Sequence, residues 1–87
     1  METINQTQAE RVSALDVQDG DIILKYGYRC RASGCRFSAA HDGVVVKSFV
    51  LTSEPNDKFP DPLPSGFDGG EFGGSKHATE WREVSVG

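Results

Sequence analysis

Apolar and polar side chains alternate along much of the chain between residues 19 and 52. The first alternating segment has large apolar side chains at every second position: Ile22, Leu24, Tyr26, Tyr28 and Cys30. Successive side chains of a strand point to opposite faces, so this segment is predicted to be a half-buried strand of an antiparallel sheet. After an Asp-Gly turn at residues 41–43, residues 44–52 begin with three valines, which predicts a central strand covered on both faces or a barrel strand near closure. Residues 78–86 have the composition of a last strand.

A turn at residues 31–34 is predicted to join the first two strands as a hairpin. The turn reads Arg-Ala-Ser-Gly, and with its two central residues at the bend Cys30 would face Cys35. Tyr28 would face Phe37 on the same side, which favours this register because cross-strand aromatic pairs are stabilising. The glycine of this turn could instead take the left-handed position of a longer loop, and the register would then shift.

The hairpin register also sets Arg29 opposite Arg36. Like charges directly opposite each other are destabilising, so this pair requires a counter-charge. Residues 21–50 carry five basic and two acidic side chains, whereas residues 51–87 carry three basic and seven acidic ones. We therefore expect the acidic region 54–83, or the carboxylates of a partner, to balance the arginines.

The chain outside the predicted strands is polar or rich in proline and glycine. Thr7 followed by Glu10 matches a capping box, which predicts a short helix within residues 1–14; the alternative is a frayed arm. Residues 54–77 contain all four prolines and five of the ten glycines, and they show no periodicity. A loop of this length is typically either functional or disordered.

These elements predict a single all-β domain over residues 15–87. The expected architecture is a small SH3-like or OB-like barrel, or a strongly bent sheet, of four to six mainly antiparallel strands. A short N-terminal helix or arm at residues 1–14 precedes it, and the long Pro/Gly loop at residues 54–77 lies before the last strand. Residues 15–21, a leucine followed by a short spacer and Gly-Asp, resemble the segment that leads into the first strand of many small barrels, SH3-like ones among them.

Two cysteines and two histidines are the candidate metal ligands: Cys30, Cys35, His41 and His77. Four soft ligands suit a tetrahedral zinc site, but their spacing matches no standard zinc pattern, so we expect no metal and no cofactor. The first twenty residues lack the basic start and apolar core of a signal peptide, which predicts a cytoplasmic protein. Thiols stay reduced in that compartment, so we expect free cysteines rather than a disulfide.

The sequence contains no recognisable catalytic constellation. His41 and Asp42 are adjacent and therefore cannot face each other as a base and its orienting carboxylate. The glycine-rich segment 66–76 carries Asp68 and Glu71, which would repel a phosphate, and it matches no nucleotide-binding fingerprint. No stretch approaches the ~20 apolar residues of a membrane-spanning helix. We therefore expect a protein that is not an enzyme and has no membrane partner.

Two groups of side chains remain as candidates for binding. One is the basic face of the predicted strands over residues 21–47: Lys25, Arg29, Arg31 and Arg36. The other is a set of aromatic side chains in the long loop and the last strand: Phe67, Phe72 and Trp81. We expect a small binding module that acts through protein–protein contact. Self-association as a homo-oligomer is included, because a basic strand face and acidic loops are complementary between copies.

Two other functions fit the composition less well. A single-stranded nucleic-acid binder would use the same basic face together with stacked aromatics. The predicted strand phase, however, places the aromatics on the other face, and the chain is acidic, with a net charge of −4 and a pI near 5.0. The third alternative is a small metal- or ligand-binding enzyme subunit, which would need oligomerisation to build a pocket.

Overall fold

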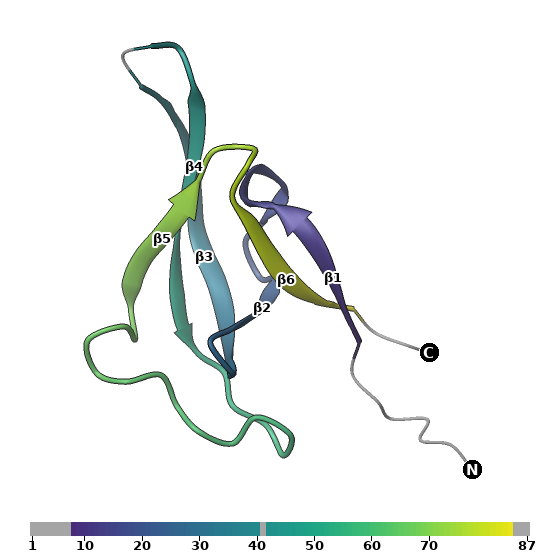
Figure 1. Ribbon diagram of the computed structural model, residues 1–87. Coiled ribbons are helices and arrows are strands. Elements are labelled where there is room, and N and C mark those ends of the chain that lie inside the picture. Colours follow the sequence, from purple (N-terminus) through teal and green to yellow (C-terminus); the bar gives the residue numbers. More distant parts are fainter. Residues whose placement is uncertain (1–7, 41, 85–87) are drawn as a thin grey trace.

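The computed structural model describes residues 8–40 and 42–84, which form a six-stranded antiparallel sheet (Figure 1). The strands are β1 (Gln8–Ser13), β2 (Ile22–Lys25), β3 (Tyr28–Ala39), β4 (Val45–Ser53), β5 (Gly70–Gly74) and β6 (Thr79–Val84). Their order in the sheet is β1-β6-β2-β3-β4-β5, and a 3₁₀ turn, η1 (Ala14–Asp16), follows β1. The predicted all-β, mainly antiparallel class is confirmed.

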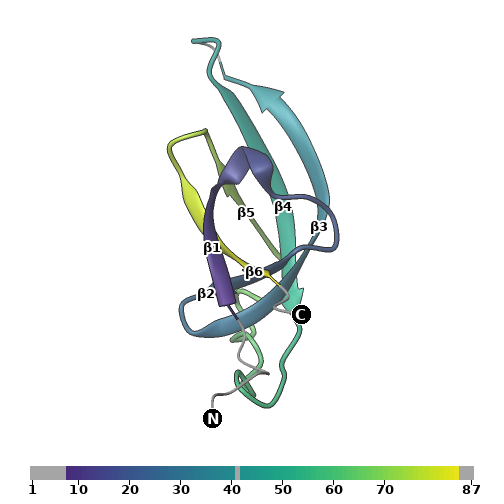
Figure 2. The same cartoon turned by 90° about the vertical axis from the view of Figure 1, so that its right-hand side faces the viewer.

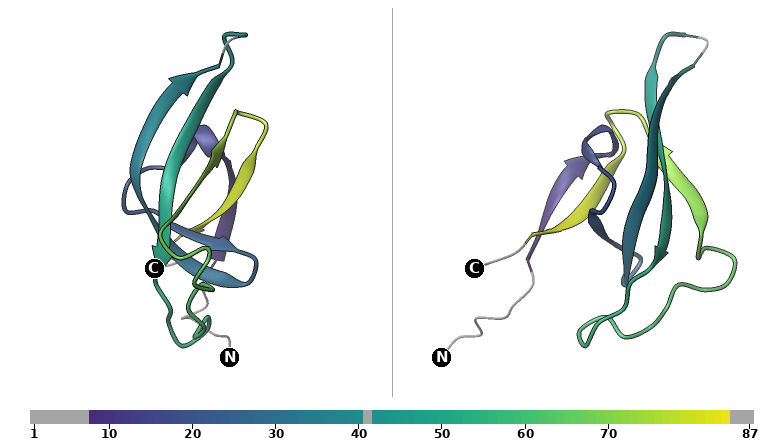
Figure 3. Two further views of the ribbon diagram at one scale, coloured as in Figure 1. Left: turned by 90° about the vertical axis from the view of Figure 1, so that its left-hand side faces the viewer. Right: turned by 180° about the vertical axis from the view of Figure 1, so that it is seen from behind.

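The sheet bends into two wings and stays open (Figures 2 and 3). β1, β6 and β2 form one wing, and β3, β4 and β5 form the other. β1 and β5 are the two edges of the sheet and do not pair with each other. The described residues are therefore not closed into a barrel, and the closure expected of an SH3-like or OB-like fold is not confirmed.

The core lies between the two wings, beneath η1. Its buried apolar side chains come from η1, from three strands and from the segments that connect them: Ala14, Val17, Ile23, Cys30, Ala32, Phe49, Leu51 and Leu63. In β4 buried side chains alternate with half-exposed ones, as expected for a strand that has one face toward a core. The core is small, as is usual for a domain of this length.

The first hairpin turns at Tyr26 and Gly27, and the prediction of a turn at residues 31–34 is wrong. Both turn residues have positive φ, 56° and 82°, which is the backbone conformation that a two-residue type I′ turn requires. β2 and β3 pair so that Leu24 lies opposite Arg29. The predicted first strand therefore contains all of β2, a tight turn and the start of β3.

β3 runs as one strand of twelve residues through the predicted break. Between Ser33 and Arg36 it carries one more residue than β4, and Gly34, with φ of 63°, takes up this bulge. Three predicted cross-strand pairs therefore do not form: Cys30 with Cys35, Tyr28 with Phe37, and Arg29 with Arg36. The two cysteines lie five residues apart in an extended strand, about 15 Å, which exceeds the ~7 Å between Cα atoms that a disulfide allows.

The predicted N-terminal helix is wrong for the residues that the structure describes. Residues Gln8–Ser13 form the edge strand β1, which pairs along its length with β6. Glu10 accepts hydrogen bonds from the guanidinium of Arg82 instead of capping a helix. Thr7, the predicted capping residue, lies outside the described residues.

The predicted loop at residues 54–77 is shorter than expected because it contains strand β5, Gly70–Gly74. The segment before β5 is held at Ser53. The Ser53 N–H donates to the carboxylate of Asp68 at 3.0 Å, and the Ser53 hydroxyl accepts from the Leu63 N–H at 2.8 Å. The Leu63 side chain is buried in the core, so the loop is fixed to the sheet at its middle and at its end.

Glycines allow β5 to lie close against its neighbours. A β-carbon on Gly73 would overlap the carbonyl oxygen of Lys47 and lie 2.9 Å from the Cα of Ser48. The φ of 145° at Gly73 is also a conformation that L-residues with a side chain rarely adopt. A β-carbon on Gly74 would lie 2.5 Å from that of Ala78. The glycine-rich sequence of this segment therefore reflects close contact between strands.

Candidate functional site

The basic side chains predicted as a binding face are engaged with glutamates of the chain itself. Four ion pairs join them to the acidic region 54–83: Lys25 with Glu80, Arg29 with Glu83, Arg31 with Glu54, and Arg36 with Glu71. The N···O distances of these pairs lie between 2.6 and 3.2 Å. The prediction that this region supplies the counter-charge is confirmed.

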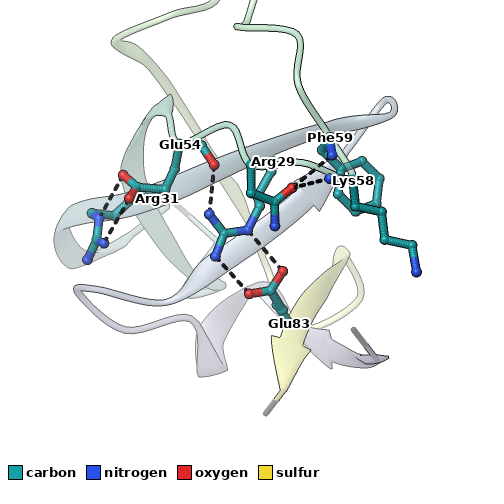
Figure 4. Close-up of polar contacts among 7 residues, drawn as sticks. Arg29, Arg31, Glu54, Lys58, Phe59 and Glu83 are labelled. Atoms are coloured by element: carbon teal, nitrogen blue, oxygen red, sulfur yellow. Dashed lines mark hydrogen bonds and ion pairs between the residues drawn. The ribbon is translucent and has the colours of Figure 1, made fainter. Parts of the chain in front are cut away.

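Arg29 makes the most complete of these contacts (Figure 4). Its Nε and Nη2 donate to the two carboxylate oxygens of Glu83 at 3.0 and 2.9 Å, and its Nη1 donates to the backbone carbonyl of Glu54 at 2.8 Å. The hydrogen bond to Glu83 raises the pKa of the Arg29 guanidinium, because the charged form is the one that donates. Three directed hydrogen bonds hold this side chain between β3, β6 and the loop after β4.

Arg31 and Arg36 form more exposed pairs on the same face of β3. The Nε and Nη2 of Arg31 each donate to an oxygen of Glu54 at 3.2 Å, and this contact lowers the pKa of the Glu54 carboxyl. Arg36 lies 2.6 Å from Glu71 and so reaches across β4 to β5. Exposed pairs add only ~0–1 kcal/mol to stability. Their main consequence here is that both cations are neutralised at short range.

Lys25 does not share the face of the arginines, and that part of the prediction is wrong. The first turn sets Lys25 opposite Tyr28 on the core side of the sheet, whereas Arg29 points to the outer side. The Lys25 ammonium donates to both carboxylate oxygens of Glu80, at 2.9 and 3.1 Å, and lies 5.6 Å from the ring centre of Phe72. The predicted basic face therefore splits into three arginines outside and one lysine inside.

The three predicted aromatic residues do not form one surface. Phe67 is exposed on the loop before β5. Trp81 is 50% exposed on the outer side of β6, where Leu24 and Arg11 are its cross-strand neighbours. Phe72 points to the inner side and lies against the core. A single aromatic contact surface built from these residues is thus not present.

A surface that sequence reasoning missed lies on the hairpin of β3 and β4. β5 ends opposite Lys47, and beyond this point the hairpin continues as a projecting two-stranded ribbon (Figure 1). We call this ribbon, residues 37–40 and 42–46, the arm. It exposes three large apolar side chains: Phe37 at 60%, Val44 at 44% and Val45 at 46%. The prediction that these valines are covered on both faces is wrong, because the arm projects beyond the other strands of the sheet (Figure 1).

Lys47 lies at the base of the arm and is only 7% exposed. Its ammonium donates to the Leu15 carbonyl at 3.2 Å and lies 4.7 Å from the ring centre of Phe37. It forms an ion pair with no carboxylate among the residues that the structure describes. A cation–π contact of this kind contributes about 0.5–2 kcal/mol, and it holds the Phe37 ring over β4.

Two hollows adjoin these elements. One, of about 410 Å³, lies beside the arm and is lined by residues 43–45, by Leu15 of η1 and by residues 75–77 of the turn between β5 and β6. The other, of about 530 Å³, is more open and lies along β5, with Lys25 and Glu71 among its lining residues. The first hollow is the one that continues the apolar surface of the arm.

The two cysteines are free thiols, one buried and one partly buried. Burial raises the pKa of Cys30 to about 11. Burial, together with the nearby Asp19 carboxylate, raises the pKa of Cys35 to about 11. His77 is exposed, His41 lies outside the described residues, and the described residues contain no group of three side chains that could hold a metal ion. The ligands considered for zinc are therefore not brought together in the described part of the chain.

We expect both thiols to resist alkylation in the folded protein. At pH 8 a thiol with a pKa of about 11 is deprotonated in only about one molecule in a thousand. Brief treatment with iodoacetamide, followed by intact-mass measurement, should leave the native chain unmodified under conditions that add two groups to the urea-unfolded chain. Rapid modification of native Cys35, the more exposed of the two, would contradict the assignment.

Comparisons of the chain with protein-family models, with curated proteins and with solved structures find no significant match. Among the residues that the structure describes, no helix is long and apolar enough to cross a membrane. The arm, the outward-facing ion pairs and the exposed Trp81 are the features from which a function can be argued.

Proposed function

We propose that this protein is a small, non-enzymatic binding module that contacts another protein through its arm. One observation carries the proposal: the arm projects from the sheet and exposes Phe37, Val44 and Val45 (Figure 1). Phe37 and Val45 share one face of the ribbon, because Phe37 pairs with Lys47 and Val45 lies two positions before Lys47. Apolar side chains that are exposed together mark interaction surfaces more often than scattered ones do. Aromatic side chains dominate the binding energy of many such interfaces, and Phe37 is the largest of the three.

The arm is held in a defined conformation before any partner binds. Its two strands continue β3 and β4, which supports a ribbon that would be marginal by itself. At the base, the Lys47 ammonium fixes the ring of Phe37. At the tip, the Asp42 carboxylate accepts a hydrogen bond from the Val44 N–H at 3.1 Å. A surface that is already ordered loses less conformational entropy on binding, which favours association.

A nucleic acid is a weaker candidate partner than a protein. Arg29, Arg31 and Arg36, which were expected to contact phosphates, would each have to leave a glutamate of this chain. The charged side chains that form no ion pair with another described residue are mainly acidic: Asp16, Asp19, Asp42, Asp57, Asp61 and Asp68, against Arg11, Lys47, Lys58 and Lys76. A polyanion would therefore meet a surface that is negative on balance.

Site-specific photocrosslinking tests the proposal. Benzoylphenylalanine replaces Phe37 in one variant, Val44 in a second and Trp81 in a matched control. Trp81 is a suitable control because it is 50% exposed but lies on the outer side of β6. Each variant is irradiated in the cells that produce it, and the adducts are identified by mass spectrometry. We expect protein adducts from the arm positions and few or none from Trp81.

Two results would overturn the proposal. One is an arm that yields no adduct from either position, in variants whose circular dichroism spectra match that of the original protein. The other is an adduct from Trp81 that is as abundant as those from the arm, which would place the contact on the outer side of β6 instead.

A further inference from the structure

We infer that the outer edge of β4 in the arm is a self-association site, at which two copies of this chain pair antiparallel about a two-fold axis through Val45. The inference rests on the proposed function, because it names a second copy of the chain as the protein that the arm contacts. Three features support it: the backbone geometry of the edge, the side chains along it and the charges at its ends.

The outer edge of β4 is free in the arm. β5 covers this edge only as far as Lys47, which lies opposite Gly74. Backbone groups of successive strand residues point alternately to the two sides. The Val44 carbonyl points to β3, where it accepts from the Ala40 N–H at 2.9 Å, and the Lys47 carbonyl points to β5. The N–H and C=O of Val45 therefore point outward, to a side that no strand of the described residues occupies.

A second copy can satisfy both backbone groups of Val45 at once. In the hydrogen-bonded position of an antiparallel pair, two opposite residues exchange both N–H···O=C bonds. With the two-fold axis at Val45, this residue lies opposite its own counterpart, so each copy donates one bond and accepts one. Val44 of each copy then lies opposite Val46 of the other. All three pairs are β-branched and uncharged, which makes the cross-strand contacts favourable.

The two edge strands of the sheet, β1 and β5, lack this combination. Proteins commonly protect exposed edges with charged side chains or with a covering segment. β1 carries Glu10 and Arg11, and β5 carries Glu71, with Lys25 lining the same hollow. Residues 44–46 have no charged side chain. The outer edge of β3 in the arm, residues 37–40, is also unpaired by any described strand and uncharged, but its Phe-Ser-Ala-Ala sequence has a lower strand propensity than three valines. Residues 44–46 are therefore better suited to pairing with another strand.

Charged residues at the two ends of the seam, which is the strand pair formed by residues 44–46 of the two copies, also fit the antiparallel dimer. In the antiparallel pair, Gly43 of one copy approaches Lys47 of the other, so the tip of each arm lies beside the end of the other copy's β5. The tip carries Asp42 and the turn after β5 carries Lys76; both are exposed, and neither forms an ion pair with another described residue. The hollow of about 410 Å³ beside this turn leaves room for the tip. Because the axis repeats the contact, the assembly closes as a dimer.

The seam is short, and the dimer is therefore expected to be weak and reversible. Three residues from each copy form the strand pair, which buries much less than the ~800 Å² per partner of a standard interface. We expect a dissociation constant of roughly 10 µM to 1 mM.

Sedimentation equilibrium of the purified full chain, from about 10 µM to 1 mM, tests the inference. The average mass should rise with concentration from that of the 9.4 kDa chain toward twice that value. Val45→Lys should abolish the rise, because two lysines would then lie opposite each other on the axis. Ser38→Lys is the matched control: it places the same charge on the same arm, but on β3, and it should dimerise like the original protein.

A second pair of variants tests the charges without altering the edge. Lys76→Glu should weaken the dimer roughly 3- to 10-fold, since it sets a carboxylate beside Asp42 of the other copy, whereas Lys76→Arg should leave the dissociation constant unchanged. If Val45→Lys fails to fold, the two Lys76 variants still test whether the chain self-associates through the arm.

Several outcomes overturn the inference. The inference is wrong if the original chain stays monomeric at the highest concentration. It is also wrong if the chain dimerises but neither Val45→Lys nor Lys76→Glu weakens the dimer. The two proposals fail separately. A monomer whose arm crosslinks to a different protein refutes self-association and leaves the binding function standing, whereas a monomer whose arm gives no adduct refutes both.

Discussion

Gly73→Ala is expected to remove a large part of the free energy of unfolding of this protein. The added β-carbon would overlap the Lys47 carbonyl oxygen and lie 2.9 Å from the Cα of Ser48, and neither backbone atom can move away without separating β5 from β4. Alanine would also be strained at the φ of 145°. Backbone overlap and strain together place this change among the largest single-residue effects, above ~3 kcal/mol. Domains typically have only about 5–15 kcal/mol in total.

Urea unfolding followed by circular dichroism measures this loss, and Gly66→Ala is the matched control. Gly66 lies in the loop before β5, where an added β-carbon would have no atom within 4 Å and φ is not positive. Its stability should stay within about 1 kcal/mol of the original protein. If both variants lost the same stability, the close contact between β5 and β4 would not be the cause.

The second large effect is expected at the ion pair between Lys25 and Glu80. Only 19% of the Lys25 side chain and 6% of the Glu80 side chain are exposed. Glu80→Gln keeps the shape of the side chain but leaves the Lys25 ammonium without a carboxylate in a mostly buried site. Breaking a buried pair in this way typically costs about 3–5 kcal/mol; since Lys25 retains some contact with solvent and the amide oxygen can still accept, we expect about 2 kcal/mol.

The exposed pair between Arg36 and Glu71 supplies the comparison. Glu71→Gln removes the same charge from a pair whose side chains are 66% and 51% exposed, and it should change stability by less than about 0.5 kcal/mol. Lys25→Met combined with Glu80→Gln should be more stable than Glu80→Gln alone, because no unpaired charge remains buried. Equal losses from Glu80→Gln and Glu71→Gln in denaturant unfolding would show that burial does not set the strength of these pairs.

The fold class could be predicted because the central strands each have one face on the core. A strand with one face on the core has a buried apolar residue at every second position, as in β4, where Phe49 and Leu51 alternate with more exposed residues. The sequence of β1 does not show this alternation of buried and exposed residues. Its pairing with β6 comes from the far end of the chain, and this distant contact overrides the local helix signal of Thr7 and Glu10.

The first turn was misplaced for a local reason. Tyr26 adopts a φ of 56°, a conformation that is unusual for tyrosine, so Tyr-Gly does not stand out as a turn sequence. Gly34 was the more obvious candidate, but its conformational freedom serves a bulge within β3 instead. With the turn misplaced, Lys25 was assigned to the wrong face, because a shift of one residue moves a side chain to the other side of a sheet.

The counter-charge of the arginines could be predicted from composition, but the arm could not. A small domain with a basic middle and an acidic end brings opposite charges together wherever its strands meet, so only the identity of each pair depended on the fold. The valines at residues 44–46 are apolar whether or not another strand covers them. Whether they are covered depends on how far the hairpin of β3 and β4 extends beyond the other strands (Figure 1), which the apolar pattern does not show.

The position of β6 between β1 and β2 also has a consequence for the synthesis of the protein. At about 5–20 residues per second, β1 leaves the ribosome roughly 4–15 s before the strand that it pairs with. The hairpin of β3 and β4, whose strands are adjacent in the chain, is complete about 30 residues before β6, whereas the wing that contains β1 must wait. The hairpin that carries the arm can therefore form before the sheet is complete.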